Sequence, residues 1–156
     1  MRRNKHWICL ILLTVALAIA SCNRKTIYHH YEHTPVSGWE KNDTLQFNIP
    51  AAKELAVAQR EVELRVTGAY PFQSICLIVE QTTLPSHIFR RDTITCTLMS
   101  TTGDIKGKGI SLYQYRFPMS DISLNEGDSL SITIRHNMKR EILPGITDIG
   151  IHLNAY

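Results

Sequence analysis

Beyond residue 42, apolar and polar residues alternate with a period of two in short runs that end at turn-forming residues. This pattern is typical of half-buried antiparallel strands. In one run Val62, Leu64 and Val66 share a face, and charged residues occupy the positions between them. Seven runs are predicted to be strands: 43–49, 61–67, 72–80, 92–99, 111–117, 129–135 and 147–154.

The predicted fold class is all-β, a single antiparallel β-sandwich of immunoglobulin-like or jelly-roll type with about seven strands. The runs are not separated by crossover helices, which excludes a parallel βαβ sheet. Only residues 51–60 have a helix-forming composition, and without a good N-cap they are expected to form a turn or two of helix at most. Residues 39–156 are predicted to be this one domain, since the roughly 135 residues left after the signal peptide fit the usual size of a single domain.

The chain begins with the plan of a secretory signal peptide, predicted over residues 1–21. Arg2, Arg3 and Lys5 precede an apolar run over residues 8–20, which is too short for a confident membrane span. The sequence Ile-Ala-Ser-Cys that ends at Cys22 resembles the lipobox of bacterial lipoproteins, in which the cysteine takes a diacylglycerol and becomes the first residue.

A second cleavage site remains open at this junction. Ala18-Ile19-Ala20 fits an A-x-A signal, and cleavage there would release a soluble protein that begins at Ser21. Lipid attachment at Cys22 is favoured, because a cysteine directly after the small residues is unexpected by chance. By resemblance to other lipoproteins, Asn23 favours the outer membrane. The basic residues that follow it favour a periplasm-facing position.

Residues 22–38 are interpreted as a tether, because neither a strand nor a helix period is visible there. The segment is rich in histidine, and such tracts can bind metal. His29 and His33 would share a helix face, but no helix start signal and no further ligand completes a four-ligand set. No metal site is predicted.

Charge excludes one class of partner. The whole chain has 17 Lys and Arg against 14 Asp and Glu, and three of the basic residues precede Cys22. The mature part is therefore neutral, which argues against nucleic-acid binding and against electrostatic attachment to a membrane. Membrane association is expected through the lipid on Cys22 instead.

No catalytic residue and no cofactor site is predicted. The glycine-rich stretch over residues 103–109 leads into a strand and lacks Lys-Ser/Thr, so it is interpreted as a turn and not as a phosphate loop. No nucleophile motif occurs, and the candidate carboxylates stand in turn contexts where Asp and Glu are ordinary. The chain is therefore expected not to be an enzyme and to have no small-molecule substrate.

Cys76 and Cys96 are the cysteines that remain in the predicted domain, in an oxidising compartment. If their strands form a hairpin centred near Ser86, the two residues face each other directly. A disulfide between opposed strand residues is possible but sterically demanding. A bonded pair and two buried free thiols both remain open, and either role is structural.

Read from Trp39 to Leu153, the chain resembles the gliding-motility-associated lipoprotein family GldH. The matching segments occur in the family's order and spacing behind a lipobox: residues 39–47, 64–65, 70–72, 92–93, the glycines of 103–109, 136–139 and 143–150. The resemblance assigns no role to its motif residues, which are Trp39, Asp43, Arg65, Tyr70, Pro71, Asp92, Gly107, Gly109, His136, Met138, Gly145, Asp148 and Gly150.

The resemblance implies a non-enzymatic accessory lipoprotein that works with other envelope proteins of gliding and of the linked secretion system. From the residues alone, Trp39 is expected to anchor the core. A second hypothesis is a glycan-binding envelope module, because jelly-roll sandwiches often carry aromatic platforms. It requires exposed coplanar rings among Trp39, Tyr70, Tyr113 and Tyr115.

Overall fold

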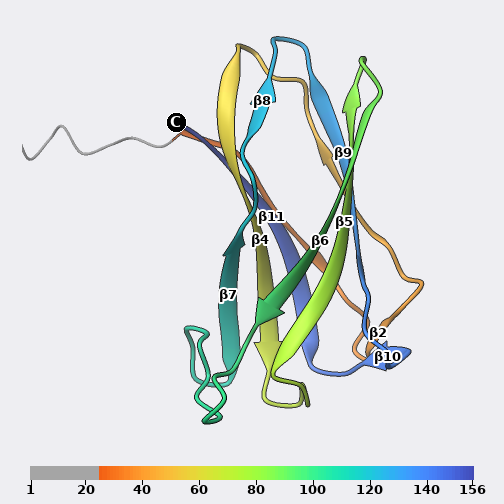
Figure 1. Ribbon diagram of the computed structural model, residues 1–156, viewed down its shortest axis with the longest axis vertical. Coiled ribbons are helices and arrows are strands. Elements are labelled where there is room, and N and C mark those ends of the chain that lie inside the picture. Colours follow the sequence, from red (N-terminus) through yellow and green to blue (C-terminus); the bar gives the residue numbers. More distant parts are fainter. Residues whose placement is uncertain (1–24) are drawn as a thin grey trace, which may run out of the picture.

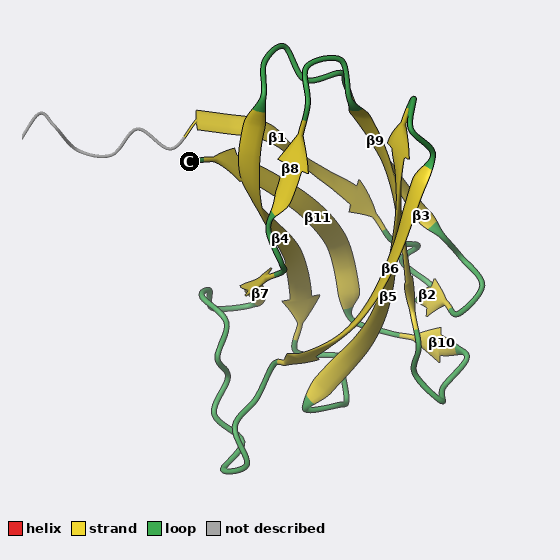
Figure 2. Cartoon of the chain, turned by 45° about the horizontal axis from the view of Figure 1, so that its top comes forward, coloured by secondary structure: helices red, strands yellow, loops and turns green. Residues whose placement is uncertain are grey.

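The structure, a computed structural model, describes residues 25–156. Figure 1 shows two large sheets that face each other, with a short strand pair at one end. Over residues 25–156 the chain forms strands and loops without a helix, as Figure 2 shows by colour. The same residues therefore contain no helix that is long and apolar enough to span a membrane. The predicted signal peptide and Cys22 lie outside the described residues.

All strand pairs are antiparallel, and the seven predicted runs all coincide with strands. The first sheet contains, in spatial order, β1 (Lys25–His33), β11 (Ile146–Ala155), β4 (Ala56–Thr67) and β7 (Leu112–Pro118), with β8 (Ile122–Leu124) also beside β4. The second sheet contains β3 (Leu45–Ile49), β9 (Ser129–His136), β5 (Ser74–Leu84) and β6 (Ile88–Thr97). The short pair is β2 (Trp39–Glu40) with β10 (Ile142–Leu143).

The expected architecture needs two corrections. The described residues form eleven strands in three sheets, where about seven strands in a single sandwich were expected. The helix expected within residues 51–60 is also absent, because Ala56–Arg60 is the first part of β4. This segment pairs with β11 on one side and in part with β8 on the other, so tertiary pairing overrides its local helix preference.

The predicted tether is corrected over Lys25–His33, which forms the edge strand β1. This strand pairs with β11 from Lys25 opposite Ala155 to His33 opposite Asp148. Its residues are mostly polar or aromatic, so the strand lacks the apolar alternation that identified the other strands. A strand at the edge of a sheet can have polar side chains on its outer face, and a hydrophobic period does not detect it.

One hydrophobic core lies between the two large sheets. Its buried side chains come from both inner faces, including Leu64 of β4, Ile151 of β11 and Ile134 of β9. Trp39 is fully buried at the end of this core, which confirms its predicted anchoring role. Its indole N–H donates to the Asp43 carbonyl at 3.1 Å, and the His136 ring meets it edge-on at 5.2 Å.

The expected register between β5 and β6 is wrong by one residue. Cys96 lies opposite Ile75 and Cys76 lies opposite Thr95, so the two sulfurs point to opposite faces of the sheet. Both cysteines are free thiols, and only Cys96 is buried. A one-residue shift has this effect because strand side chains alternate between the faces.

Thiol alkylation of the folded full chain is expected to modify Cys76 and to spare Cys96 until denaturant is added. Burial in the core raises the pKa of the Cys96 thiol to about 12, so little thiolate is available there. Peptide mapping after alkylation measures both sites, with Cys76→Ser as the control. A non-reduced digest in which one peptide pair links Cys76 to Cys96 would contradict this register.

Candidate functional site

The outer face of the first sheet carries a polar cluster, which is the first candidate site. Tyr31, Gly150, Glu63 and Arg116 lie opposite one another on β1, β11, β4 and β7. Directly opposed residues of antiparallel strands share a face, so these four form one row across the sheet. We call this row, with the rows of Glu61 and Arg65 on the same face of the sheet, the polar face.

Glu63 is at the centre of the polar face, and its side chain is completely buried. Its Oε2 accepts hydrogen bonds from the Tyr31 hydroxyl and, at 3.4 Å, from the Gln114 amide, and it lies 3.0 Å from His29 Nε2. Its Oε1 lies 2.9 Å from Arg116 Nε. Burial opposes ionisation of this carboxyl, but the Tyr31 and His29 hydrogen bonds and the Arg116 charge outweigh it and lower its pKa.

Gly150 explains how Tyr31 reaches Glu63 from two strands away. A Cβ at Gly150 would lie only 2.7 Å from the Tyr31 ring, so the absence of a side chain lets the ring lie across β11. The Arg65 guanidinium is 3.9 Å from the centre of this ring, at cation–π distance. Burial, together with the hydrogen bond and negative charge of Glu63, raises the pKa of Tyr31 to about 12.

The next row on the same face, two residues from Glu63 along β4, contains His29, His152 and Glu61 on β1, β11 and β4. The two imidazole rings are 4.4 Å apart between centroids. His152 Nδ1 lies 3.3 Å from Glu61 Oε2 and 3.5 Å from Glu63 Oε1. On a helix His29 and His33 would have shared a face, but in the strand His33 lies on the other side of the Glu63 row, beside Asp148.

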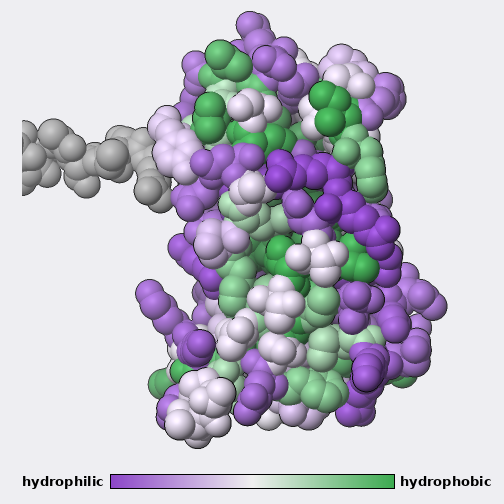
Figure 3. Space-filling view, viewed as in Figure 1, coloured by the Kyte–Doolittle hydropathy of each residue, from purple (hydrophilic) through white to green (hydrophobic). Residues whose placement is uncertain are grey.

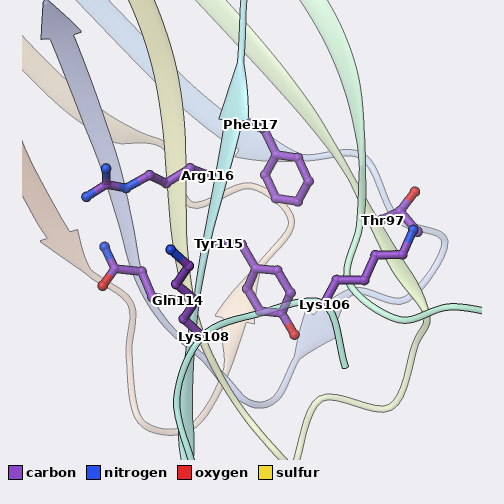
Figure 4. Close-up of a pocket in the computed structure, with 7 residues that line it drawn as sticks. All are labelled: Thr97, Lys106, Lys108, Gln114, Tyr115, Arg116 and Phe117. Carbon is purple, nitrogen blue, oxygen red and sulfur yellow. The ribbon is translucent and has the colours of Figure 1, made fainter. Parts of the chain in front are cut away.

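A groove beside β7 is the second candidate site (Figure 4). Its volume is about 480 Å³, and two lysines and one arginine are its charged lining residues. Figure 3 shows less polar residues in the middle of this side of the molecule, with hydrophilic residues around them. The residues that line this groove, which we call the basic groove, are Thr97, Lys106, Lys108, Gln114, Tyr115, Arg116 and Phe117.

Residues of β7 and Thr97 of β6 line the basic groove, and each of these strands is an edge of its sheet. In the described part of the chain β7 pairs with β4, and its other side meets only an isolated bridge from Lys108 to Gln114. The edge strand β6 pairs with β5 alone among the described strands. Unpaired backbone groups on an edge strand can accept an added strand from another chain.

The motif residues serve the fold in four places and the polar face in a fifth. Trp39 and His136 close the core, where Met138 Sδ accepts the Cys76 N–H at 3.3 Å. Gly145 has a φ of +82°, and a Cβ there would lie 2.4 Å from the Tyr70 nitrogen. Asp92 accepts a hydrogen bond from buried Arg60. The glycines at 107 and 109 pack against residues 112–115. Arg65, Asp148 and Gly150 lie in the polar face.

The aromatic platform that a glycan-binding module would require is not formed. Trp39, Tyr70 and Tyr115 are buried, with exposed fractions of 0%, 3% and 6%. Tyr113 is half-buried and packs against the core. The glycan hypothesis is therefore wrong in the form in which the sequence suggested it.

The family described as GldH lipoprotein matches residues 26–153, which is most of the chain and both large sheets apart from the first residue of β1 and the last two of β11. The chain belongs to the GldH lipoprotein family. It is 27% identical over 150 residues to the gliding motility lipoprotein GldH of Flavobacterium johnsoniae, covering 92% of this chain and 93% of that protein. The GldH resemblance found from the motif segments is thus confirmed.

Two of the solved structures similar to this GldH-family chain are larger proteins with low sequence identity. A protein of Listeria monocytogenes EGD-e aligns with a TM-score of 0.41 and 13% identity, over 85% of this chain and 11% of that one. Latent PorU of Porphyromonas gingivalis aligns with a TM-score of 0.34 and 10% identity, over 87% and 14%. These chains are several times longer, and scores this low carry no argument about function.

Proposed function

We propose that this GldH-family chain is a lipid-anchored accessory protein of the cell envelope that acts by binding another envelope protein and not by catalysis. Family membership supports a lipoprotein connected with gliding motility. The fatty acyl anchor is proposed on Cys22, with the domain at the outer membrane and facing the periplasm. More than one acyl chain would provide stable anchoring.

The basic groove is the proposed partner site. Lys106 and Lys108 are exposed, and Arg116 lies beside them at the free edge of β7. Lys106 and Lys108, with no acidic lining residue beside them, favour a negatively charged ligand, while Arg116 is already paired with Glu63. An extended acidic segment of a partner protein fits both the charge of the groove and the open strand edge.

Charge reversal at the groove tests the partner site. The double variant Lys106→Glu with Lys108→Glu is expected to reduce crosslinking of envelope partners at least tenfold, because repulsion replaces attraction. Lys139→Glu, an exposed lysine between β9 and β10, is the matched control and should crosslink as the wild type does. Equal recovery from both variants, or recovery of bulk porins alone, would remove the support for this site.

The anchor is tested separately. The intact mass of the mature N-terminus should show a diacylglycerol and fatty acid on Cys22, and Cys22→Ser should move the protein from the membrane to the soluble fraction. If the wild type and the variant both fractionate as soluble protein, the lipid anchor is wrong, while the groove experiment still decides the partner site.

A further inference from the structure

The polar face brings two histidines and two glutamates to one place from three different strands. His29 is on β1, His152 is on β11, and Glu61 and Glu63 are on β4. One ligand atom from each of His29, Glu63 and His152 lies within 4.8 Å of the other two. The positions span more than 120 residues of sequence, so only the register of the sheet brings these ligand types together.

The donor atoms lie close enough together to reach a single metal ion, with each histidine near a different oxygen of Glu63. Ligand atoms at about 2.0–2.1 Å from a tetrahedral Zn²⁺ lie roughly 3.3–3.4 Å apart. His29 Nε2 is 3.0 Å from Glu63 Oε2, and His152 Nδ1 is 3.5 Å from Glu63 Oε1. Glu61 Oε2 lies 3.3 Å from His152 Nδ1 and holds that ring beside the site.

An unsatisfied buried atom points to a missing ligand at this place. Glu63 Oε1 is buried without a hydrogen-bond donor, although buried carboxylate oxygens nearly always have one. Arg116 Nε is 2.9 Å away as an ion pair, but its N–H is not aligned for a hydrogen bond. Asn154 Nδ2, at 3.4 Å from His152 Nδ1, is a long contact that a metal ion would replace.

We propose that His29, His152 and Glu63, with water completing the shell, bind a divalent transition-metal ion of the Zn²⁺ type. Two imidazoles and one carboxylate suit Zn²⁺ better than Mg²⁺ or Ca²⁺, which require more oxygen ligands. The side chain of His29 is 37% exposed, so the ion enters from the solvent side of that ring. The bound ion ties the edge strand β1 to β11 and β4, which stabilises the strand next to the N-terminal segment.

Zinc titration of the purified full chain by calorimetry tests the site. One saturable Zn²⁺ per chain is expected, and His29→Gln should weaken its binding at least tenfold. His30→Gln is the matched control, because His30 is a neighbouring exposed imidazole on the other face of β1. The zinc affinity of this variant should stay within twofold of wild type. Zinc should raise the Tm of the wild type and of His30→Gln, but not that of His29→Gln.

Cobalt absorption identifies the ligands and covers the case in which a variant folds poorly. Co²⁺ in the wild-type chain should give the intense bands of a tetrahedral site without thiolate charge transfer, and His152→Gln should abolish those bands. Any of three results would overturn the site. These are no saturable zinc binding, an equal loss of zinc affinity in His29→Gln and His30→Gln, or a cobalt spectrum with thiolate charge transfer.

Discussion

Replacing Trp39 with alanine is expected to lower the free energy of unfolding by about 3–5 kcal/mol, the usual cost of removing a large buried aromatic side chain. The indole is fully buried at the end of the core, where it contacts the His136 ring and donates to the Asp43 carbonyl. Its removal leaves a cavity and an unpaired carbonyl at the same place. Denaturant unfolding followed by circular dichroism measures the loss.

Trp39→Phe is the control for this prediction, because it retains most of the apolar volume and loses the N–H donor. It should cost clearly less than the alanine variant. A loss below about 1 kcal/mol in Trp39→Ala would contradict the assignment of Trp39 to the core.

Replacing Arg60 with alanine is expected to be similarly severe, at about 3–5 kcal/mol, because it breaks a buried ionic and hydrogen-bonded network. Arg60 is 1% exposed on β4, and its guanidinium donates to Gln81 of β5 at 2.7 Å and to Asp92 of β6 at 3.3 Å. It therefore links the two large sheets. Its loss leaves the buried Gln81 side chain without its donor.

Arg90→Ala is the matched control for Arg60. Arg90 Nε lies at the same 3.3 Å distance from the Asp92 carboxylate, but its side chain is 42% exposed. An exposed ion pair is worth less than about 1 kcal/mol, so this variant should unfold almost as the wild type does. Equal losses in the two variants would mean that burial of Arg60 contributes nothing to stability.

The two candidate sites share Arg116, so binding at one site can affect the other. Arg116 is the ion-pair partner of Glu63 in the polar face and also lines the basic groove. A metal ion at Glu63 would compete with Arg116 for the carboxylate and leave its guanidinium more available to an acidic partner. The separate variants at His29 and at Lys106 with Lys108 keep the two proposals distinguishable.

The polar face could not be predicted from the sequence. The strand over residues 61–67 was predicted with Glu61, Glu63 and Arg65 on a face that meets water or a partner. Its partner is the chain itself, since Tyr31 and His29 of β1 cover Glu63. The sequence gives no indication of this contact, because β1 has no apolar alternation. The need for glycine at position 150 is apparent only when the Tyr31 ring is placed across it.

The sequence by itself determined the class of the fold, because apolar alternation depends only on which residues a strand buries. The seven predicted strands, the buried position of Trp39 and the family all follow from such local patterns and motifs. Tertiary structure decided what depends on pairing: the edge strand β1, the register that separates Cys76 from Cys96, and the meeting of His29 with Glu63 and His152. A shift of one residue in pairing reverses every side chain, and the local pattern alone does not specify that register.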